Sequence, residues 1–319
     1  MNEPSKIIDP SIGPMKLVEA GIVVRRYYLE HKTKKEIAEE LGISRFRVAR
    51  LLDQAIEHGL VTITINTPPR IDVELSVRLR AAFGLRRAVV AVATDGPDTF
   101  LRQDLGQVAG SLLSELVTAE DVVGIAWGRT LDAMTASLTS IAPCTVVQIT
   151  GVAGTPAENS TELVRRMAVA SGGPLYQFFV PLVLPDAHTA STLRSQPDVI
   201  AASSRFPAIS VAVLAVGSWD PPDSQLRDAL AEKDREQLER SGVVAEICAV
   251  FLDEQGRAVH SAVEQRCISI TAPQLQLIPE LIAVAGGRNK VRAIRAVLRG
   301  GYATTLVTDS ITAESLLND

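Results

Sequence analysis

The sequence is poor in cysteine and has no pattern of metal ligands. Its three cysteines, Cys144, Cys248 and Cys267, are far apart and lie in apolar stretches typical of strands. An odd number of widely spaced cysteines argues against a disulfide-stabilised secreted scaffold, so we expect reduced core residues in a cytoplasmic protein. The four histidines are scattered, and neither a CxxC nor an HExxH motif is present. We therefore expect no metal site and no cofactor.

Long hydrophobic runs and an excess of positive charge are also absent. No segment reaches the roughly 18 uninterrupted apolar residues of a membrane-spanning helix, and the first residues lack the apolar core of a signal peptide. We expect neither membrane insertion nor export. The 32 basic and 37 acidic residues give a net charge of −5. This balance excludes a uniformly basic nucleic-acid binder, but it allows a small basic module within an acidic chain.

The chain is long and rich in aliphatic residues. Its 319 residues exceed the usual size of a single core, which favours two domains of unequal length. Because 46% of the residues are hydrophobic and only 4% are aromatic, Leu, Val, Ile and Ala must build the cores. The local patterns divide the chain into an N-terminal tail over 1–14, a small helical domain over 15–68 and a large domain over 69–319.

The most specific motif is KKEIAEELGISRFRVARLL, residues 34–52. Thr33 and Glu36 have the spacing of a capping box, which predicts a helix from about residue 34 to 41. Gly42 suits a tight turn, and Ser44 predicts the start of a further helix that runs to about residue 59. Ala38 is small where the two helices of a helix-turn-helix cross. The alternative, a plain helical hairpin with a solvated basic face, does not require this pattern.

The second helix of such a motif lies in the major groove of DNA, and the helix before it meets the backbone. We expect base-edge contacts near the start of the second helix, which has no acidic residue before Asp53. The alternating run over 61–65 predicts a strand, which favours a winged variant. The candidate DNA-binding residues are Lys34, Lys35, Ser44, Arg45, Arg47 and Arg50.

Beyond a helical pattern over 71–83, short β-branched runs alternate with helical segments. This alternation predicts an α/β fold with a doubly wound, mostly parallel sheet that is covered on both faces. The helix over 71–83 has apolar residues four apart, and this stripe either forms part of a dimer contact or packs on its own domain. The predicted strands begin at Ala88, Val122, Thr145, Leu175, Ile209, Glu246, Leu281 and Thr305.

Four glycine-bearing loops follow predicted strands. In an open α/β sheet such loops converge on one crevice, and free N–H groups at helix starts suit an anion. Together with Lys290 they predict a sugar or phosphate site, although each glycine alone also fits an ordinary turn and Lys290 also fits a solvated helix-end charge. The candidate residues from these loops are Gly128, Arg129 and Thr130, then Gly151 and Gly154, then 217–219, and finally 286–290 with Lys290.

The sequence resembles the SorC family of sugar-responsive transcriptional regulators, from about Lys16 to Leu317. The resemblance implies an effector domain with the fold of sugar-phosphate isomerases and deaminases, a phosphorylated sugar as effector, and a dimer or tetramer bound to operator DNA. It also implies ligand contacts from Gly128, Thr130, Asp253, Arg266 and Lys290. The stretches that carry it are the helix-turn-helix, GIAWGRTL at 124–131, GSW at 217–219, FLDEQGRAV at 251–259, and the long run IAVAGGRNKVRAIRAVLRGGYATTLVTDSITAESLL at 282–317.

These observations favour a repressor of a carbohydrate-utilisation operon and leave three alternatives. The segment TPAEN at 155–159 suits hydroxyl groups as well as phosphate, so the effector is alternatively a non-phosphorylated polyol. An isomerase-like enzyme would need a general base, for which Asp186, Glu246 and Asp253 qualify by type. Asp253 equally fits a hairpin turn, because DEQG lies between two predicted strands. The third alternative is a structural DNA-binding protein without a ligand.

Overall fold

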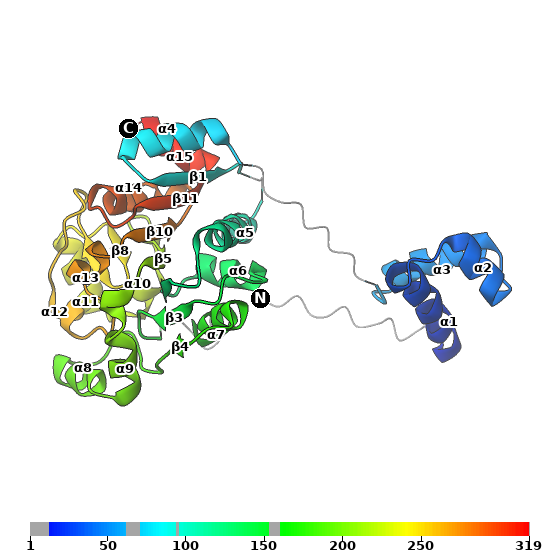
Figure 1. The fold of residues 1–319 in the computed structure, drawn as a ribbon. Helices are drawn as coiled ribbons and strands as arrows, with labels where there is room; N and C mark the ends of the chain where they lie inside the picture. The colour runs from blue at the N-terminus through cyan, green and yellow to red at the C-terminus, as the bar shows by residue number, and fades with distance from the viewer. Residues whose placement is uncertain (1–12, 62–70, 94–95, 153–159, 319) are drawn as a thin grey trace. The chain divides into compact units, whose positions relative to one another are not determined.

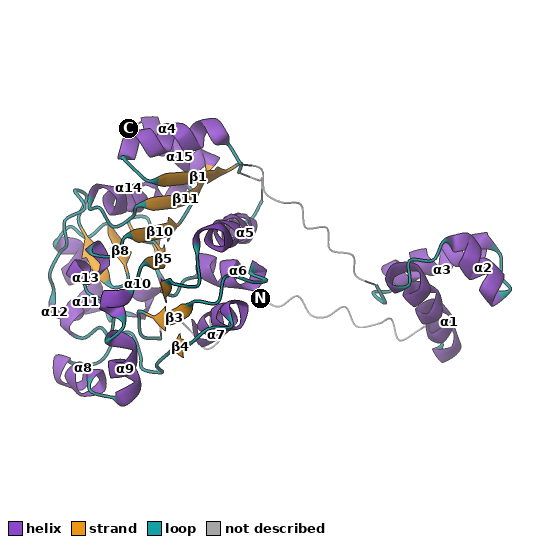
Figure 2. Cartoon of the chain, in the orientation of Figure 1, coloured by secondary structure: helices purple, strands orange, loops and turns teal. Residues whose placement is uncertain are grey.

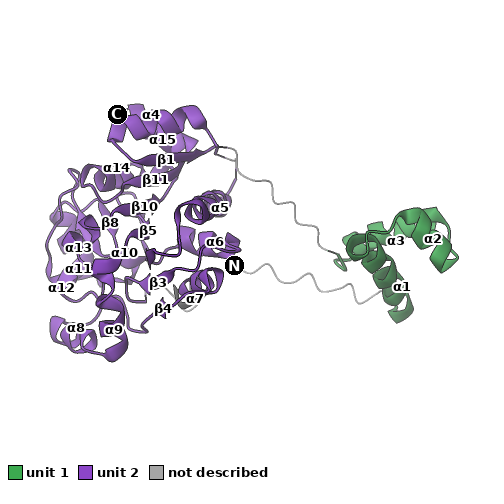
Figure 3. Cartoon of the chain, viewed as in Figure 1, with its two compact units in different colours: residues 1–67 green, residues 68–319 purple. Residues whose placement is uncertain are grey.

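The computed structural model describes residues 13–61, 71–93, 96–152 and 160–318 and divides the chain into two compact units, residues 1–67 and 68–319 (Figures 1 and 3). Most of the strand predicted over 61–65 lies outside the described residues, so the wing stays a prediction. The same holds for the predicted tail, apart from Gly13 and Pro14, which begin the first helix.

Unit 1 contains the predicted helix-turn-helix. The capping box of Thr33 and Glu36 is present at the start of α2, and Gly42 ends that helix with a φ of 64°. The hydroxyl of Ser44 accepts a hydrogen bond from the N–H of Arg47 and so caps α3. The local predictions are therefore confirmed. The helices are α1 (Pro14–Val24), the π-helix η1 (Arg25–Leu29), α2 (Lys34–Leu41) and α3 (Arg45–Glu57).

The core of unit 1 is small and aliphatic. Val23 of α1, Ile37 of α2 and Val48 of α3 are fully buried in one cluster. Ala38 is also buried, at the place where the predicted crossing of helices needs a small side chain. Packing of α1 and α2 against one face of α3 leaves the other face of α3 toward solvent.

The centre of unit 2 is a seven-stranded sheet in which every pair of neighbouring strands is parallel, in the order β1-β11-β10-β5-β2-β3-β4. The predicted α/β class is thus confirmed. The run that begins at Leu175 gives only two residues of strand. The strands are β1 (Arg87–Ala91), β2 (Val122–Ile125), β3 (Thr145–Gln148), β4 (Leu175–Tyr176), β5 (Val211–Ala215), β10 (Glu280–Val284) and β11 (Thr305–Asp309).

Helices cover both faces of this sheet (Figure 2). Three of them, α5 (Asp98–Leu116), α6 (Arg129–Ser137) and α7 (Ser160–Ser171), line one face, and α14 (Val291–Arg299) lies on the other side with the second sheet. Gly106 lets α5 and α6 pack closely, because a Cβ there would lie 2.6 Å from the backbone nitrogen of Met134. The shorter helices are α8 (Ala187–Arg194), α9 (Pro197–Ser203), α10 (Gln225–Ala229), α11 (Glu232–Arg240), α12 (Ala262–Gln265) and α13 (Ala272–Gln276).

The second sheet corrects one part of the prediction. The run 246–252, predicted as one strand of the parallel sheet, forms an antiparallel hairpin of β8 (Ala245–Ile247) and β9 (Val250–Leu252). Cys248 and Ala249 have φ values of 52° and 61° and make its turn. A continuous apolar run gives no sign of such a turn when both strands are buried. Residues 217–219, predicted as a loop, form strand β6 (Gly217–Trp219) beside β7 (Pro222–Asp223).

The helix predicted over 71–83 is α4 (Val73–Phe83), and it packs on its own unit. Leu75 and Leu79 are buried in the main core, next to β1 and α15 (Ser310–Asn318). Of the two alternatives for the predicted apolar stripe, a dimer contact or packing on its own domain, the structure shows the packing. Val73 and Val77, which are 69% and 59% exposed, form a separate apolar strip on the same helix.

All three cysteines are free and buried, as predicted. Burial raises the pKa of the Cys267 thiol to about 12. These side chains therefore act as small apolar core groups. No helix among the described residues is long and apolar enough to cross a membrane.

Candidate functional site

The surface of α3 that faces away from the core carries most of the candidate DNA-binding residues. Arg45, Arg47 and Arg50 are all exposed, and the guanidinium of Arg47 pairs with Glu19 of α1 at 2.8 Å. Ser44 is exposed but its hydroxyl is used as the cap of α3. A partner that binds Arg47 must therefore compete with Glu19 for its guanidinium.

The predicted phosphate contacts lie at the start of α2. Lys35 is exposed and its ammonium is 3.9 Å from Glu39, one turn further along the helix. The ammonium of Lys34 lies 5.8 Å from the centre of the Tyr27 ring, which is within the range of a cation–π contact. Both lysines remain near the helix N-terminus, as the motif predicted.

In unit 2 a pocket opens at the carboxyl ends of three adjacent parallel strands, β2, β5 and β10. Three of the four predicted glycine loops meet there, namely those that follow these strands. A crevice at this edge is the usual ligand position in an open α/β sheet. The lining residues are Arg102, Ala126, Trp127, Gly128, Arg129, Thr130, Ala215, Val216, Gly217, Asp223, Ser224, Gln225, Glu246, Cys248, Val284 and Lys290.

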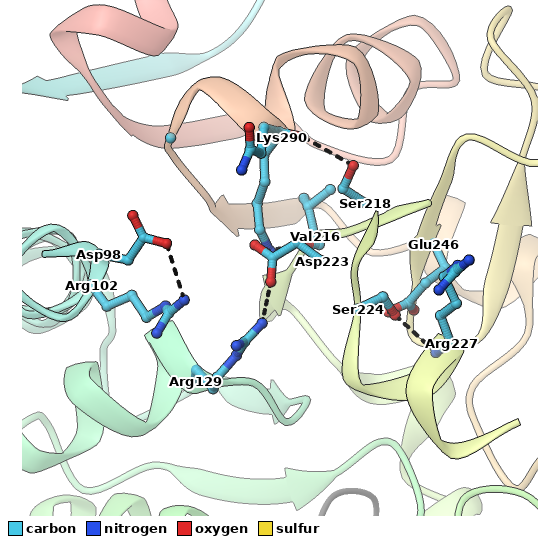
Figure 4. Close-up of polar contacts among 12 residues, drawn as sticks. Asp98, Arg102, Arg129, Val216, Ser218, Asp223, Ser224, Arg227, Glu246 and Lys290 are labelled. Atoms are coloured by element: carbon cyan, nitrogen blue, oxygen red, sulfur yellow. Dashed lines mark hydrogen bonds and ion pairs between the residues drawn. The ribbon is translucent and has the colours of Figure 1, made fainter. Parts of the chain in front are cut away.

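Lys290 is the central cation of the pocket (Figure 4). It ends the 3₁₀-helix η3 (Arg288–Lys290), and its ammonium donates to the carbonyl oxygen of Val216 at 2.6 Å and lies 3.4 Å from the carboxylate of Asp223. Its side chain is only 17% exposed, and this burial lowers the pKa of Lys290. Lys290 is therefore an inward-pointing charge rather than a solvated helix end.

Asp223 bridges two of the three basic side chains that line the pocket. Its carboxylate pairs with the guanidinium of Arg129 as well as with Lys290 (Figure 4). Burial favours the neutral acid, but the charges of Lys290 and Arg129 outweigh burial and hold the pKa of Asp223 below its usual value. Asp223 is therefore an ionised internal counter-ion at the centre of the site.

Glu246 is a buried acidic residue of the pocket lining. It is 6% exposed, and its carboxyl accepts hydrogen bonds from the hydroxyl of Ser224 at 3.0 Å and from the N–H of Ala249 at 3.4 Å. Burial raises the pKa of Glu246. Gly217 makes room for this side chain, since a Cβ there would lie 2.2 Å from its Oε1 atom. Glu246 thus offers the pocket a buried carboxyl group with an increased tendency to hold a proton.

Gly128 and Thr130 lie in the wall that joins β2 to α6. Gly128 has a φ of 150°, and a Cβ there would come within 2.6 Å of the Cβ of Ala215. Glycine is required at this position both by its φ and by the close approach of β5. The turn brings the start of α6, with Arg129 and Thr130, against the pocket.

Two residues assigned by resemblance lie outside this pocket. Asp253 closes a turn in which its carboxylate accepts from the N–H groups of Gln255 and Arg257, and it lines a different surface depression. Arg266 pairs with Asp234 at 2.6 Å and donates to the carbonyl oxygen of Pro185. Neither residue lines the pocket at β2, β5 and β10, and each is bound to groups of its own neighbourhood, so the effector contacts that the resemblance implies for them stay predictions.

Gly151, after β3, is not among the residues that line the pocket. The N–H of Gly151 donates to the carbonyl oxygen of Ile268, and a Cβ at Gly151 would lie 2.7 Å from the backbone of Leu182. Gly151 therefore serves a close backbone crossing, and its contact with an effector stays a prediction. Gly154 lies outside the described residues, so its assignment stays a prediction.

Sequence reasoning missed several lining residues, of which Asp223 is the most informative. It follows a Pro-rich loop, and the only local signal is the Ser224 cap of the short helix α10. Glu246 was considered only as a possible catalytic base. Of the other two candidates for that role, Asp186 caps α8 through Thr189, and Asp253 belongs to its turn. Neither lies beside the pocket lining.

Comparison with known proteins finds a matching family model for each of the two units. Residues 68–318 match the family model described as "Putative sugar-binding domain", and residues 19–58 match "Sigma-70, region 4". Transcriptional regulator YjhU of Escherichia coli is 31% identical over 302 residues, which cover 91% of this chain and 92% of that protein. The deoxyribonucleoside regulator of Bacillus subtilis is 28% identical and covers 92% of this chain and 96% of its own length.

A solved structure shows the same architecture. The crystal structure of the full-length sorbitol operon regulator SorC from Klebsiella pneumoniae superposes with a TM-score of 0.71 and 25% sequence identity, over 95% of this chain and 99% of that one. The match includes the helix-turn-helix as well as the large domain. The chain therefore belongs to the SorC family of sugar-binding transcriptional regulators.

Proposed function

We propose that this transcriptional regulator is a repressor of a carbohydrate-utilisation operon, and that a phosphorylated sugar bound in the Lys290 pocket controls its hold on operator DNA. The observation that carries this proposal is the pairing of Lys290 and Arg129 through one carboxylate at the carboxyl ends of β2, β5 and β10. An anion placed there meets two basic groups that are already directed toward a negative charge.

The charge balance of the pocket supports an anionic effector. Arg102, Arg129 and Lys290 are basic, and against them stand Asp223 and Glu246, of which Glu246 has a raised pKa. Three basic groups against two acidic ones give the lining an excess of positive charge, which protonation of Glu246 would enlarge. A phosphate group restores the balance, and N–H groups at the start of α6 suit its oxygens.

The remaining lining groups suit the hydroxyls of a sugar. Ser224, Gln225 and Glu246 offer donors and acceptors on one side of the pocket. The same groups favour the second candidate effector, a non-phosphorylated polyol, because a carboxyl and an amide bind hydroxyl pairs without any phosphate. The two effectors differ in whether Lys290 and Arg129 contribute to affinity.

Thermal unfolding of the full chain with matched ligands tests the effector. Each sugar phosphate is compared with its parent sugar, with the corresponding polyol and with inorganic phosphate. A ligand present at about 100 times its Kd stabilises the folded state by about 2.7 kcal/mol. We expect a shift for one class of sugar phosphate and none for the parent sugar. A shift for the polyol alone supports the second candidate, and no shift with any compound contradicts both.

The DNA contacts belong to the proposal as well. Arg45, Arg50 and Lys35 are exposed, and we propose that α3 enters the major groove while the start of α2 meets phosphates. Selection of binding sequences from a random DNA pool by the full chain tests this step. Recovery of one shared sequence motif supports it, and recovery of unrelated sequences contradicts it.

We further propose a homo-oligomer that places two recognition helices about 34 Å apart on a pseudo-palindromic operator. The exposed strip of Val73 and Val77 on α4 supports an apolar contact, since 69% and 59% of these side chains face solvent in the single chain. Analytical ultracentrifugation at micromolar concentration, with and without DNA, measures the assembly. A monomer under both conditions contradicts the proposal.

A further inference from the structure

Phe46 is the most exposed large apolar side chain among the described residues. It is 85% exposed, and it lies at the second residue of α3, between Arg45 and Arg47. The sequence analysis did not assign it a role. A phenyl ring held in water loses the free energy that its burial would supply, so this position has no explanation in the stability of unit 1.

The helix itself fixes the direction of the ring. Val48, Leu51, Leu52 and Ala55 are buried, so the face that contains them packs on α1 and α2. Phe46 belongs to the opposite face, where Arg50 follows it four residues later and Ala49 three residues later. Its ring is therefore part of the same surface as the exposed Arg50.

The charges around the ring indicate what kind of partner covers it. Arg45 and Arg50 are both exposed, and α3 contains no acidic residue before Asp53. An apolar group set among guanidinium groups suits an anionic surface that carries small apolar patches. The major groove of duplex DNA has this character, because phosphates line its edges and the C5-methyl group of thymine is the apolar group on its floor.

We propose that Phe46 contacts the C5-methyl group of a thymine in the operator and so specifies a T·A pair next to the bases contacted by the arginines. This inference rests on the proposed DNA-binding function and adds an apolar contact to it. Arginine side chains recognise guanine best, whereas a phenyl ring recognises the methyl group that distinguishes thymine from cytosine.

The test removes the methyl group from the DNA rather than the ring from the protein. In the operator obtained by selection, each dT is replaced in turn by dU, which pairs identically and lacks only the C5-methyl group. We expect binding by the unaltered full chain to weaken about fourfold at one position of each half-site, the factor for burying one methyl-sized group. Phe46→Ala should bind the unsubstituted operator less tightly and lose its response to dU at that position.

A matched control separates this effect from a general one. Leu277 is 82% exposed and lies in unit 2, and Leu277→Ala should leave operator affinity and the dU response unchanged. The inference is overturned if no dU substitution weakens binding, or if Phe46→Ala responds to dU as the parent does. It is also overturned if Phe46→Ala changes the sedimenting mass of the DNA-free protein, since the ring then serves a contact between copies. If the unaltered protein selects no shared sequence from the random DNA pool, the result contradicts the proposed function rather than this inference.

Discussion

The two units of this protein place their charges in opposite ways. On unit 1 the basic side chains of α3 point into solvent, and only Arg47 is held by a neighbour, Glu19. In unit 2 Lys290, Asp223 and Glu246 are mostly buried: Lys290 is bound to Asp223 and to the backbone of Val216, and Glu246 accepts from the hydroxyl of Ser224. Exposed charges meet a partner with little reorganisation, whereas buried and neutralised charges must exchange one partner for another.

This difference in charge placement suits the two proposed ligands, DNA for unit 1 and a small effector for unit 2. DNA is a large polyanion that a surface can contact without changing the fold, and its affinity comes from many weak ionic contacts. A small effector must replace internal contacts, and only such an exchange can couple its binding to a second conformation. Substitutions in each unit test this difference in the placement of charge.

The largest effect is expected at Lys290. Lys290→Met keeps the buried aliphatic stem and removes the charge, so affinity for the effector anion should fall by about 2–5 kcal/mol. Affinity for the operator without effector should not change. Fluorescence of Trp127, which lines the pocket, measures the first quantity, and gel-shift titration measures the second.

Arg288 provides the matched control for Lys290. It is an exposed basic residue of the same 3₁₀-helix, and Arg288→Ala should leave effector affinity unchanged. If Lys290→Met titrates like the parent, the buried charge of unit 2 does not serve ligand binding, and the contrast between the units has another origin.

The next largest effect concerns the exposed arginines of α3. Arg45→Ala and Arg50→Ala should each reduce the preference for operator over random DNA by about 1–3 kcal/mol, because base-edge contacts are lost. Arg47→Ala should reduce it less, since its guanidinium is bound to Glu19. Titrations of both DNAs over a range of salt concentrations give the preference.

Lys35→Ala tests a phosphate contact, in contrast to the base contacts tested by the arginine variants. It should weaken operator and random DNA equally and lower the slope of log affinity against log salt by about 1, as expected for one phosphate contact. A larger loss of preference for Arg47→Ala than for Arg50→Ala would show that the Glu19 pair opens on DNA and that the recognition surface has been misassigned.

A smaller effect of opposite sign is expected at Asp223. Asp223→Asn removes the internal counter-ion of Lys290 and Arg129, so affinity for the effector anion should rise by about 1 kcal/mol. Because the folded-state pKa of Asp223 is lowered, its ionisation stabilises the parent above the usual value of 3.8, and this contribution is lost as the pH falls through the lowered pKa. Unfolding of Asp223→Asn should lack that acid dependence. Unchanged or weaker anion binding would contradict a competing role for the carboxylate.

The smallest effect is expected at Ser44. Ser44→Ala removes the cap of α3 and should destabilise that helix by about 1 kcal/mol. Hydrogen exchange of the Arg47 amide measures this loss directly. Ser44→Asp should keep the cap and weaken DNA binding through repulsion of phosphates. If Ser44→Ala lowers operator affinity without faster exchange, the hydroxyl is a DNA contact instead.

Most of unit 1 was predictable because its rules are local. The capping box at Thr33, the turn at Gly42 and the cap at Ser44 each depend on residues within four positions, and the structure contains all three. The direction of individual side chains was not predictable. Arg47 appeared equivalent to Arg45 in the sequence, and only the packing of α1 placed Glu19 beside it.

The alternation of β-branched runs and helices was enough to predict the parallel sheet of unit 2, and the glycine turns with Lys290 indicated the edge of the sheet at which the pocket lies. Only the tertiary structure decided which groups share that edge. It brought Asp223 and Glu246, 67 and 44 residues before Lys290, to its side and left Asp253 and Arg266 among other partners. Secondary structure follows from periodicities of a few residues, whereas a pocket gathers side chains from strands that are adjacent in the sheet and distant in the chain.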